Sequence, residues 1–328
     1  MGRVLDVRDL RVQFRIEEKY YDAVRGVNFH LDEGETLGLV GESGCGKSVT
    51  SLAVMRLLRG ATRVTGVVDY KGQNLVSISD RQMRKLRGSE LAMIFQEPMT
   101  SLNPVHTIGR QLVEVLWIHH RIKGREAHSA VLQLLHQVGI PRAEGIVREY
   151  PHQLSGGMRQ RIMIAMAMAC NPTVLIADEP TTALDVTIQA QILDLMRHLT
   201  SSRNMSTLLI THDLGVVAEM CNRVAVMYAG QIVESGTVRQ VFKNPQHPYT
   251  VGLLKSIPRL DGDRGRLHSI DGNVPSLRRM PQGCRFAPRC QHAMDICRSE
   301  DPPVTNIEPE HQARCWLHDD GKVGESVV

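Results

Sequence analysis

A glycine-rich segment directly follows a short apolar run in this chain. The run Thr36 to Val40 reads TLGLV, and residues 41–48 read GESGCGKS, which fits Gly, four residues, Gly, Lys, then Ser or Thr. A strand that ends in such a turn and opens into a helix points several backbone N–H groups at one anion. The apolar spacing of the next residues, SVTSLAVMRLL, is typical of a helix. The pattern therefore predicts a nucleoside triphosphate site.

The side chains of this loop suit polyphosphate and magnesium. Gly41, Gly44 and Gly46 let the backbone come close to phosphates and adopt conformations that a Cβ forbids. Lys47 is expected to reach the β- and γ-phosphates, and the Ser48 hydroxyl is expected to ligate Mg²⁺. The other expected nucleotide-binding positions here are Ser43, Cys45 as a small filler, and Val49.

The composition indicates an ordinary globular protein. With 328 residues, 42% apolar and 23% charged, the chain has room for roughly two domains and is neither fibrous nor disordered. No apolar stretch approaches the ~20 residues that cross a bilayer, so the chain is expected to stay on the cytoplasmic side. The net charge of +4 is too small an excess to argue for nucleic-acid binding.

Strand-like and helix-like segments alternate along most of the sequence. Short strands are expected between residues 3 and 40, and helices between Glu97 and about Tyr150. Further strand signals lie at 173–180, 207–213 and 223–236. Continuous apolar strands that alternate with helices indicate a mostly parallel sheet with helices on its faces, an α/β fold. The composition turns to Pro, Arg, Gly and Cys near Asn244, which places a domain boundary near 245.

Two acidic residues end one of the apolar strands. In VLIADEP, Asp178 and Glu179 are expected at the carboxyl edge of the sheet, where open α/β folds bind ligands. Asp178 is expected to hold Mg²⁺, directly or through water, and Glu179 to polarise an attacking water. Two acids at a strand end are more often only solvated, but the phosphate loop in the same chain favours the catalytic interpretation.

The segment LSGGMRQ, residues 154–160, precedes a helix-like run. Ser155, Gly156 and Gly157 would place backbone N–H groups at the start of that helix, which forms a second anion-binding concavity. The alternative is a plain helix cap, because Ser is among the preferred capping residues. Taken alone, the segment favours the cap.

The order of these motifs resembles the ATPase subunit of ATP-binding-cassette transporters over about residues 3–240. The resemblance implies a P-loop cassette over residues 1–245, with a mixed sheet core and a helical subdomain at about 97–170. The motifs that carry it are GESGCGKS, Gln96, LSGGMRQ, VLIADEP, Ala183-Leu184-Asp185 and His212. Met158 departs from the Gln or Glu that usually follows the glycine pair of this family.

The resemblance also implies a head-to-tail dimer with two ATP molecules between the subunits. In it, Ser155, Gly156 and Gly157 would touch the γ-phosphate of the partner's ATP, and Asp185 would line the shared interface. Further roles follow from the same resemblance: Gln96 joins Mg²⁺ and water to the membrane partner, His212 senses the γ-phosphate, and Tyr20 or Tyr21 stacks on adenine.

The C-terminal segment narrows the resemblance to one branch. NPQHPYTVGLLKSIPRL at 244–260, CRFAPRC at 284–290 and QEPMTSLNP at 96–104 are similar to the dipeptide and oligopeptide importer ATPases, a branch that includes nickel importers. This implies an extension over 246–328 and a peripheral place at the cytoplasmic face of the plasma (inner) membrane. The implied partners are a second ABC ATPase subunit in a heterodimer, two transmembrane permease subunits and an extracytoplasmic substrate-binding protein, with no nucleic acid.

Four of the seven cysteines lie in that extension. Cys284, Cys290, Cys297 and Cys315 are separated by five, six and seventeen residues, which departs from structural zinc sites and from common ferredoxin runs. Several members of the peptide-importer branch resemble carriers of a [4Fe–4S] cluster on four such cysteines. A cluster is therefore expected, with a zinc site or four reduced thiols as the alternatives.

The resulting interpretation is an ATPase subunit that uses ATP and Mg²⁺ to energise import of di- and oligopeptides. One alternative is the same ATPase role in a nickel or other small-solute importer. Another is a soluble, non-transport cassette ATPase, which would be expected to carry a basic tract or a second cassette. A non-catalytic regulatory module would be expected to lack Glu179 or Lys47, and both are present.

Overall fold

The computed structural model describes residues 2–97, 101–182, 184–257 and 269–319. Pro98, Met99 and Thr100 of the QEPMTSLNP segment and Ala183 lie outside the described residues. The chain forms two compact units. The first unit consists of Met1–Val4, Leu31–Thr36 and Ser77–Ile210, and the second of Leu5–His30, Leu37–Val76 and Thr211–Val328.

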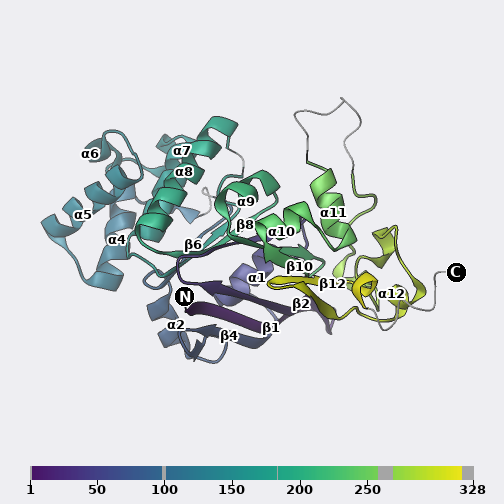
Figure 1. Cartoon of the computed structure of the whole chain (residues 1–328). Coiled ribbons are helices and arrows are strands. Elements are labelled where there is room, and N and C mark those ends of the chain that lie inside the picture. The colour runs from purple at the N-terminus through teal and green to yellow at the C-terminus, as the bar shows by residue number, and fades with distance from the viewer. Residues whose placement is uncertain (1, 98–100, 183, 258–268, 320–328) are drawn as a thin grey trace. The chain divides into compact units, whose positions relative to one another are not determined.

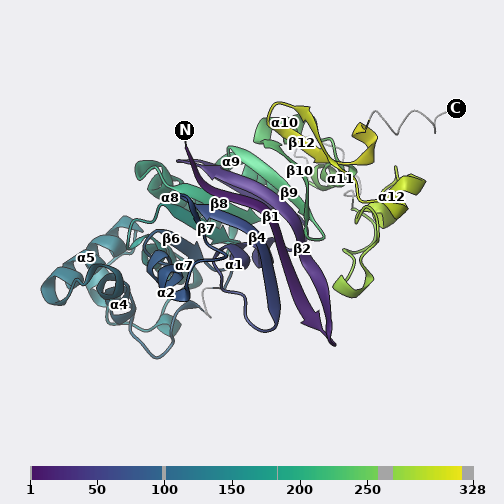
Figure 2. The same ribbon diagram turned by 90° about the horizontal axis from the view of Figure 1, so that it is seen from below.

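An antiparallel sheet of long strands belongs to the second unit (Figure 2). Its order is β2-β1-β4-β5, with bounds Lys19–Asp32, Arg3–Ile16, Thr62–Tyr70 and Gln73–Asn74. The pairing of β1 with β4 shifts register between Arg8 and Arg11, where Asp9 has a φ of 46°. Such a bulge changes which side chains face the core, so Leu10 and Val12 are both fully buried beyond it. In place of the short strands expected at the start of the chain, the structure has the long strands β1 and β2.

A second group of strands in the same unit carries the phosphate loop. The order is β11-β12-β10-β9-β3, with bounds Val304–Glu308, His311–Arg314, Gln231–Thr237, Arg223–Tyr228 and Thr36–Val40. β3 and β9 are parallel, whereas β10 pairs antiparallel with both β9 and β12. The single strand signal at 223–236 is therefore a hairpin, because Ala229 and Gly230 both have positive φ and reverse the chain. The sheet is mixed, as the resemblance implied.

One hydrophobic core joins the C-terminal segment to these strands. Tyr228 of β9 packs against Tyr249 and Phe286, with ring centroids 4.7 and 5.1 Å away. All three rings are at most 4% exposed. The remaining helical elements of this unit are α1 (Lys47–Val54), α9 (Leu214–Met220), α10 (Val238–Lys243), α11 (Pro248–Lys255), α12 (Asp295–Ser299) and the short 3-10 helices η2 (Leu277–Arg279), η3 (Ala287–Arg289) and η4 (Trp316–His318).

Parallel strands and a group of helices form the first unit. Strands β8 (Ser206–Thr211), β7 (Val174–Asp178) and β6 (Leu91–Ile94) lie in that order, and both pairings are parallel. α4, α5 and α7 contact one another (Figure 1), and α7 also contacts α8 and β6. The helices of this unit are α2 (Asp80–Leu86), α4 (Ile108–His120), α5 (Gly124–Gln137), α6 (Ala143–Ile146), η1 (Pro151–Gln153), α7 (Gly156–Met168) and α8 (Val186–Ser202).

Among the described residues, no helix combines the length and apolar character that crossing a membrane requires.

Candidate nucleotide site

The phosphate loop connects β3 to α1 in the second unit. Gly41 has a φ of 152°, and a Cβ there would lie 2.1 Å from the Met227 carbonyl oxygen, so only glycine fits. Gly46 has a φ of 108° and caps α1, and no side chain caps this helix start. The backbone N–H groups of a helix N-terminus lack intrahelical partners and favour an anion. The loop is therefore shaped to receive a phosphate group.

Lys47 folds back over this loop. Its Nζ donates to the carbonyl oxygens of Gly41 at 2.7 Å and Glu42 at 3.1 Å. Cys45 is 1% exposed beneath the loop, and burial raises the pKa of its thiol. Ser43 and Gly44 are exposed, whereas Ser48 and Val49 are half-buried. The ammonium group thus already lies among loop carbonyls, within the segment that the sequence assigned to phosphate.

Two predicted catalytic residues of the first unit meet at the ends of parallel strands. The Nε2 of Gln96 donates to the Oε2 of Glu179 at 3.0 Å, although the residues are 83 positions apart. β6 and β7 pair with Ile94 opposite Ala177, so both chains emerge at the same carboxyl edge. Asp178, the last residue of β7, is 4% exposed. We call Gln96, Asp178, Glu179 and Thr182 the acid edge.

Glu179 is held in a strained and specific position. Its φ of 48° lies in the left-handed region, which costs a residue with a Cβ about 1–2 kcal/mol. Its backbone N–H donates to Ile210 O at 2.9 Å, and Thr182 Oγ1 donates to its carboxylate at 2.9 Å. The hydrogen bonds from Gln96 and Thr182 fix the orientation of this carboxylate. The sequence analysis did not identify Thr182. The only pattern that could have indicated it is a hydroxyl residue three positions after Glu179.

Ser155 and Asp185 each cap a helix of the first unit. The Oγ of Ser155 accepts from Met158 N at 3.3 Å at the start of α7, and the Oδ1 of Asp185 accepts from Ile188 N at 2.9 Å at the start of α8. A Cβ on Gly157 would lie 2.9 Å from Ile188 Cγ2, so α7 packs closely on α8 at this glycine. Gly156 has more room, with Leu184 3.8 Å away. The local role of Ser155 is thus the cap that the sequence favoured.

The remaining predicted nucleotide contacts lie in the second unit. His212 is exposed between β8 and α9, next to Asp213, which caps α9. Tyr20 and Tyr21 lie on β2 and are half-buried. The guanidinium of Arg63 lies 3.7 Å from the centroid of the Tyr20 ring, so one face of that ring is covered.

The four extension cysteines gather in one region without forming a metal site. All are free thiols, and Cys284 N donates to Cys297 O at 2.8 Å. Burial raises the pKa of Cys284 to about 11 and that of Cys315 to about 12, and the charges of the neighbouring thiols add to both shifts. Among the residues that the structure describes, no three His, Cys, Asp or Glu side chains are arranged to hold a metal ion. The expected [4Fe–4S] cluster is not supported.

Comparisons with known proteins agree with this organisation. Residues 24–182 match the ABC transporter family, and residues 233–297 match the C-terminal region of oligopeptide/dipeptide transporters. The oligopeptide transport ATP-binding protein AppD of Bacillus subtilis is 52% identical, over 98% of both chains. The dipeptide transport ATP-binding protein DppD of the same organism is 51% identical, over 97% of this chain and 96% of its own.

A solved structure supports the cassette fold. The ATP-binding cassette MJ0796, in a dimeric post-hydrolysis state bound to ADP and Pi, aligns with a TM-score of 0.65 and 26% identity, and the alignment covers 72% of this chain and 99% of that one. The α/β P-loop cassette expected from the motif order is thereby confirmed. The chain therefore belongs to the family of ATP-binding proteins of peptide ABC transporters.

Proposed function

We propose that this chain hydrolyses ATP to power the import of di- and oligopeptides through an ABC transporter. The family supports the ATPase role, and relatives named for oligopeptide and dipeptide transport support the substrate class. The observation that carries the proposal is the contact of Gln96 with Glu179 at the carboxyl edge of β6 and β7. It joins two residues to which separate motifs assign catalytic roles.

The phosphate loop is the proposed binding site for the ATP polyphosphate. Lys47 would exchange its loop carbonyls for phosphate oxygens, and the N–H groups at the start of α1 would donate to the same anion. Ser48, Gln96 and Asp178 offer the hard oxygen ligands that Mg²⁺ prefers, and the ion would neutralise charge on the phosphates. Tyr20 or Tyr21 is proposed to stack on adenine, and His212 to contact the γ-phosphate.

Glu179 is the proposed general base. Because Gln96 and Thr182 both donate to its carboxylate, the group is held in one orientation. A water beside it would lose a proton to the carboxylate as the oxygen attacks phosphorus. Gln96 would hold the Glu179 base. Because Gln96 precedes helices α4 to α7 of the first unit in the sequence, it would also link ATP turnover to those helices.

A second ATPase subunit completes the proposed site. Ser155, Gly156, Gly157 and Asp185 would face the ATP bound by that subunit, in a head-to-tail heterodimer. ATP would favour the closed pair, because its γ-phosphate contacts both chains and ADP lacks that group. Two permeases and an extracytoplasmic binding protein are the further proposed partners, with this chain at the cytoplasmic face of the plasma membrane. The proposed domains are the cassette, 1–245, and the extension, 246–328.

A [4Fe–4S] cluster on the four extension cysteines is a narrower proposal. Its support is the resemblance at these four positions and the proximity of Cys284 and Cys297, whose backbones share a hydrogen bond of 2.8 Å. The described arrangement does not itself provide a metal site. Protein purified without oxygen should contain about four irons per chain, Cys315→Ser should lose them, and Cys170→Ser should retain them. Fully active, iron-free protein from that preparation would dismiss the cluster.

Peptide uptake by the assembled transporter tests the function. This chain, its sister ATPase, the permeases and the binding protein are reconstituted in liposomes with a labelled tetrapeptide. The expected result is uptake that requires ATP and that unlabelled peptide suppresses, whereas a nickel complex does not. ATP-dependent nickel uptake without peptide uptake would reassign the substrate, and no ATP turnover would reject the proposal.

A further inference from the structure

Glu42, the second residue of the phosphate loop, is held from three directions within the second unit. Its backbone N–H donates to the Oη of Tyr249 at 2.8 Å, and its carbonyl oxygen accepts from Lys47 Nζ. Its carboxylate accepts two hydrogen bonds from Arg289, Nη1 to Oε2 at 2.6 Å and Nη2 to Oε1 at 3.0 Å. Tyr249 lies in α11 and Arg289 ends η3, so two of these contacts come from the C-terminal segment.

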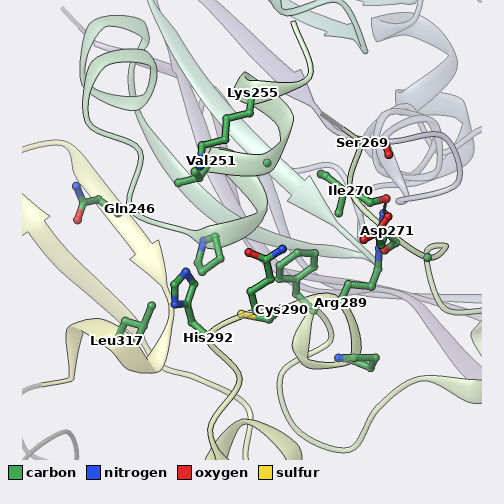
Figure 3. Close-up of a pocket in the computed structure, with 16 residues that line it drawn as sticks. Gln246, Val251, Lys255, Ser269, Ile270, Asp271, Arg289, Cys290, His292 and Leu317 are labelled. Atoms are coloured by element: carbon green, nitrogen blue, oxygen red, sulfur yellow. Dashed lines mark hydrogen bonds between the residues drawn. The ribbon is translucent and has the colours of Figure 1, made fainter. Parts of the chain in front are cut away.

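Contacts other than the one with Glu42 also fix the Arg289 side chain. Its Nε donates to Asp271 O at 2.8 Å and its Nη2 to Ile270 O at 3.0 Å, and its side chain is 6% exposed (Figure 3). The guanidinium also lies 5.7 Å from the Tyr228 ring centroid. The hydrogen bonds that Arg289 donates to Glu42 raise the pKa of Arg289, so the guanidinium stays charged. A planar fork locked in this way presents its donors to the carboxylate at little further entropic cost.

The pair has an electrostatic consequence at this place. A carboxylate in a loop that receives polyphosphate would repel that ligand, and such repulsion is strong where water is partly excluded. Glu42 is 27% exposed at its side chain and Arg289 is nearly buried, so solvent screens the pair only in part. The arginine therefore neutralises a negative charge that the loop carries next to its own ligand site.

We propose that Arg289 is a positioning residue for nucleotide binding: it neutralises and orients Glu42, so that the C-terminal segment sets the affinity of the phosphate loop for ATP. This rests on the proposed function, since it takes ATP to be the ligand of the loop. Arg289 also lines a cavity of about 500 Å³ beside α11. Its hydrogen bond to Glu42, 247 residues earlier in the sequence, connects the C-terminal segment to the phosphate loop.

The test measures the dissociation constant for MgATP on the full-length chain. Arg289→Ala should raise it about tenfold, the loss expected for one charged hydrogen-bonded pair. The double variant Glu42→Gln with Arg289→Ala should recover at least a third of that loss, because the uncompensated charge has gone. If Arg289 only supported the fold, the double variant would bind as weakly as Arg289→Ala or more weakly, and the inference would be overturned.

Two further comparisons protect the test against misfolding. Arg289→Lys and Arg289→Gln both shorten the side chain, but only lysine keeps the positive charge. The Arg289→Lys variant should therefore bind MgATP at least about fivefold more tightly than the Arg289→Gln variant. Equal constants for these two would also overturn the inference. Arg278→Ala is the matched control, because Arg278 forms an exposed pair with Glu17 at 2.7 Å, outside the loop. Its affinity should equal that of the unaltered protein.

Failure of the inference and failure of the proposed function are separable in the same assay. If Lys47→Ala abolishes MgATP binding while Arg289→Ala leaves it unchanged, the loop is the ATP site and Arg289 has no part in it. If the unaltered chain binds no MgATP, the proposed function fails first.

Discussion

The phosphate loop and the acid edge are built in different ways. Support for the loop comes from far along the chain, since Tyr249 and Arg289 bind Glu42 across 207 and 247 residues. Glu179 at the acid edge is held by Gln96 from the next strand and by Thr182 three residues on. On the proposed function, ATP binding would therefore depend on the C-terminal segment, whereas the chemistry would depend on the ends of two parallel strands.

The largest expected effect on stability concerns the support of the loop side. His311 of β12 and Glu234 of β10 are fully buried, with Nε2 and Oε1 2.8 Å apart, and join the C-terminal hairpin to the cassette strands. His311→Leu should lower the free energy of unfolding by about 3 kcal/mol, because the buried Glu234 carboxylate then keeps only its backbone N–H donors, Gln246 and His247, and loses its side-chain partner. Urea denaturation measures this. The exposed pair of His136 with Glu144 supplies the control, and an equal loss in His136→Leu would contradict the reason given.

The next effect is on the loop itself. Lys47→Ala should weaken MgATP binding about 100-fold, because it removes charge-assisted hydrogen bonds to the phosphates. Equilibrium titration with a fluorescent ATP analogue measures the change. Lys85→Ala, on the exposed surface of α2, should bind as the unaltered protein does. Retained affinity in Lys47→Ala would remove the loop from the binding site.

Acid should loosen the loop side as well. His247 is 1% exposed, its Nδ1 accepts from Tyr249 N at 3.0 Å, and burial lowers its pKa to about 3. In the unfolded chain its pKa is about 6.5, so the unfolded state binds the extra proton between these values. Stability is complete above about pH 6.5 and falls as pH drops toward 3, by about 2 kcal/mol between pH 7 and pH 5. His247→Gln should flatten that fall, and an unchanged slope would contradict the assignment.

The smallest effect concerns Thr182 of the acid edge. Thr182→Val removes a hydrogen-bond donor to Glu179 and should lower the ATP turnover rate about fivefold, which corresponds to about 1 kcal/mol. MgATP affinity should stay within about twofold, since Thr182 belongs to the chemistry side. Thr182→Ser keeps the hydroxyl and serves as the control. A fall in affinity without a fall in turnover would break the division.

The sequence predicted the local features because each is written in consecutive residues. The loop after β3, the acids at the end of β7 and the helix start at Ser155 follow from strand, cap and glycine patterns. The role of Gln96 came from the family resemblance and that of Glu179 from its place at a strand end. The structure brings the two side chains into contact.

The contacts of Glu42 could not be predicted, because they depend on tertiary packing. Neither Arg289 nor Tyr249 stands in a pattern that indicates a partner some 200 residues earlier. The hairpin at 223–236 was likewise hidden, since its apolar run continues through the turn at Ala229 and Gly230. Thr182 lacked a signal other than its spacing from Glu179.

The most direct test of the division is to measure MgATP affinity and turnover on one preparation of Glu179→Gln, assembled with its sister ATPase and permeases. The account predicts a dissociation constant within about threefold of the unaltered complex, with turnover at least about 1,000-fold slower, because the base is lost while the loop is intact. Turnover at the unaltered rate, or loss of ATP binding together with turnover, would contradict it.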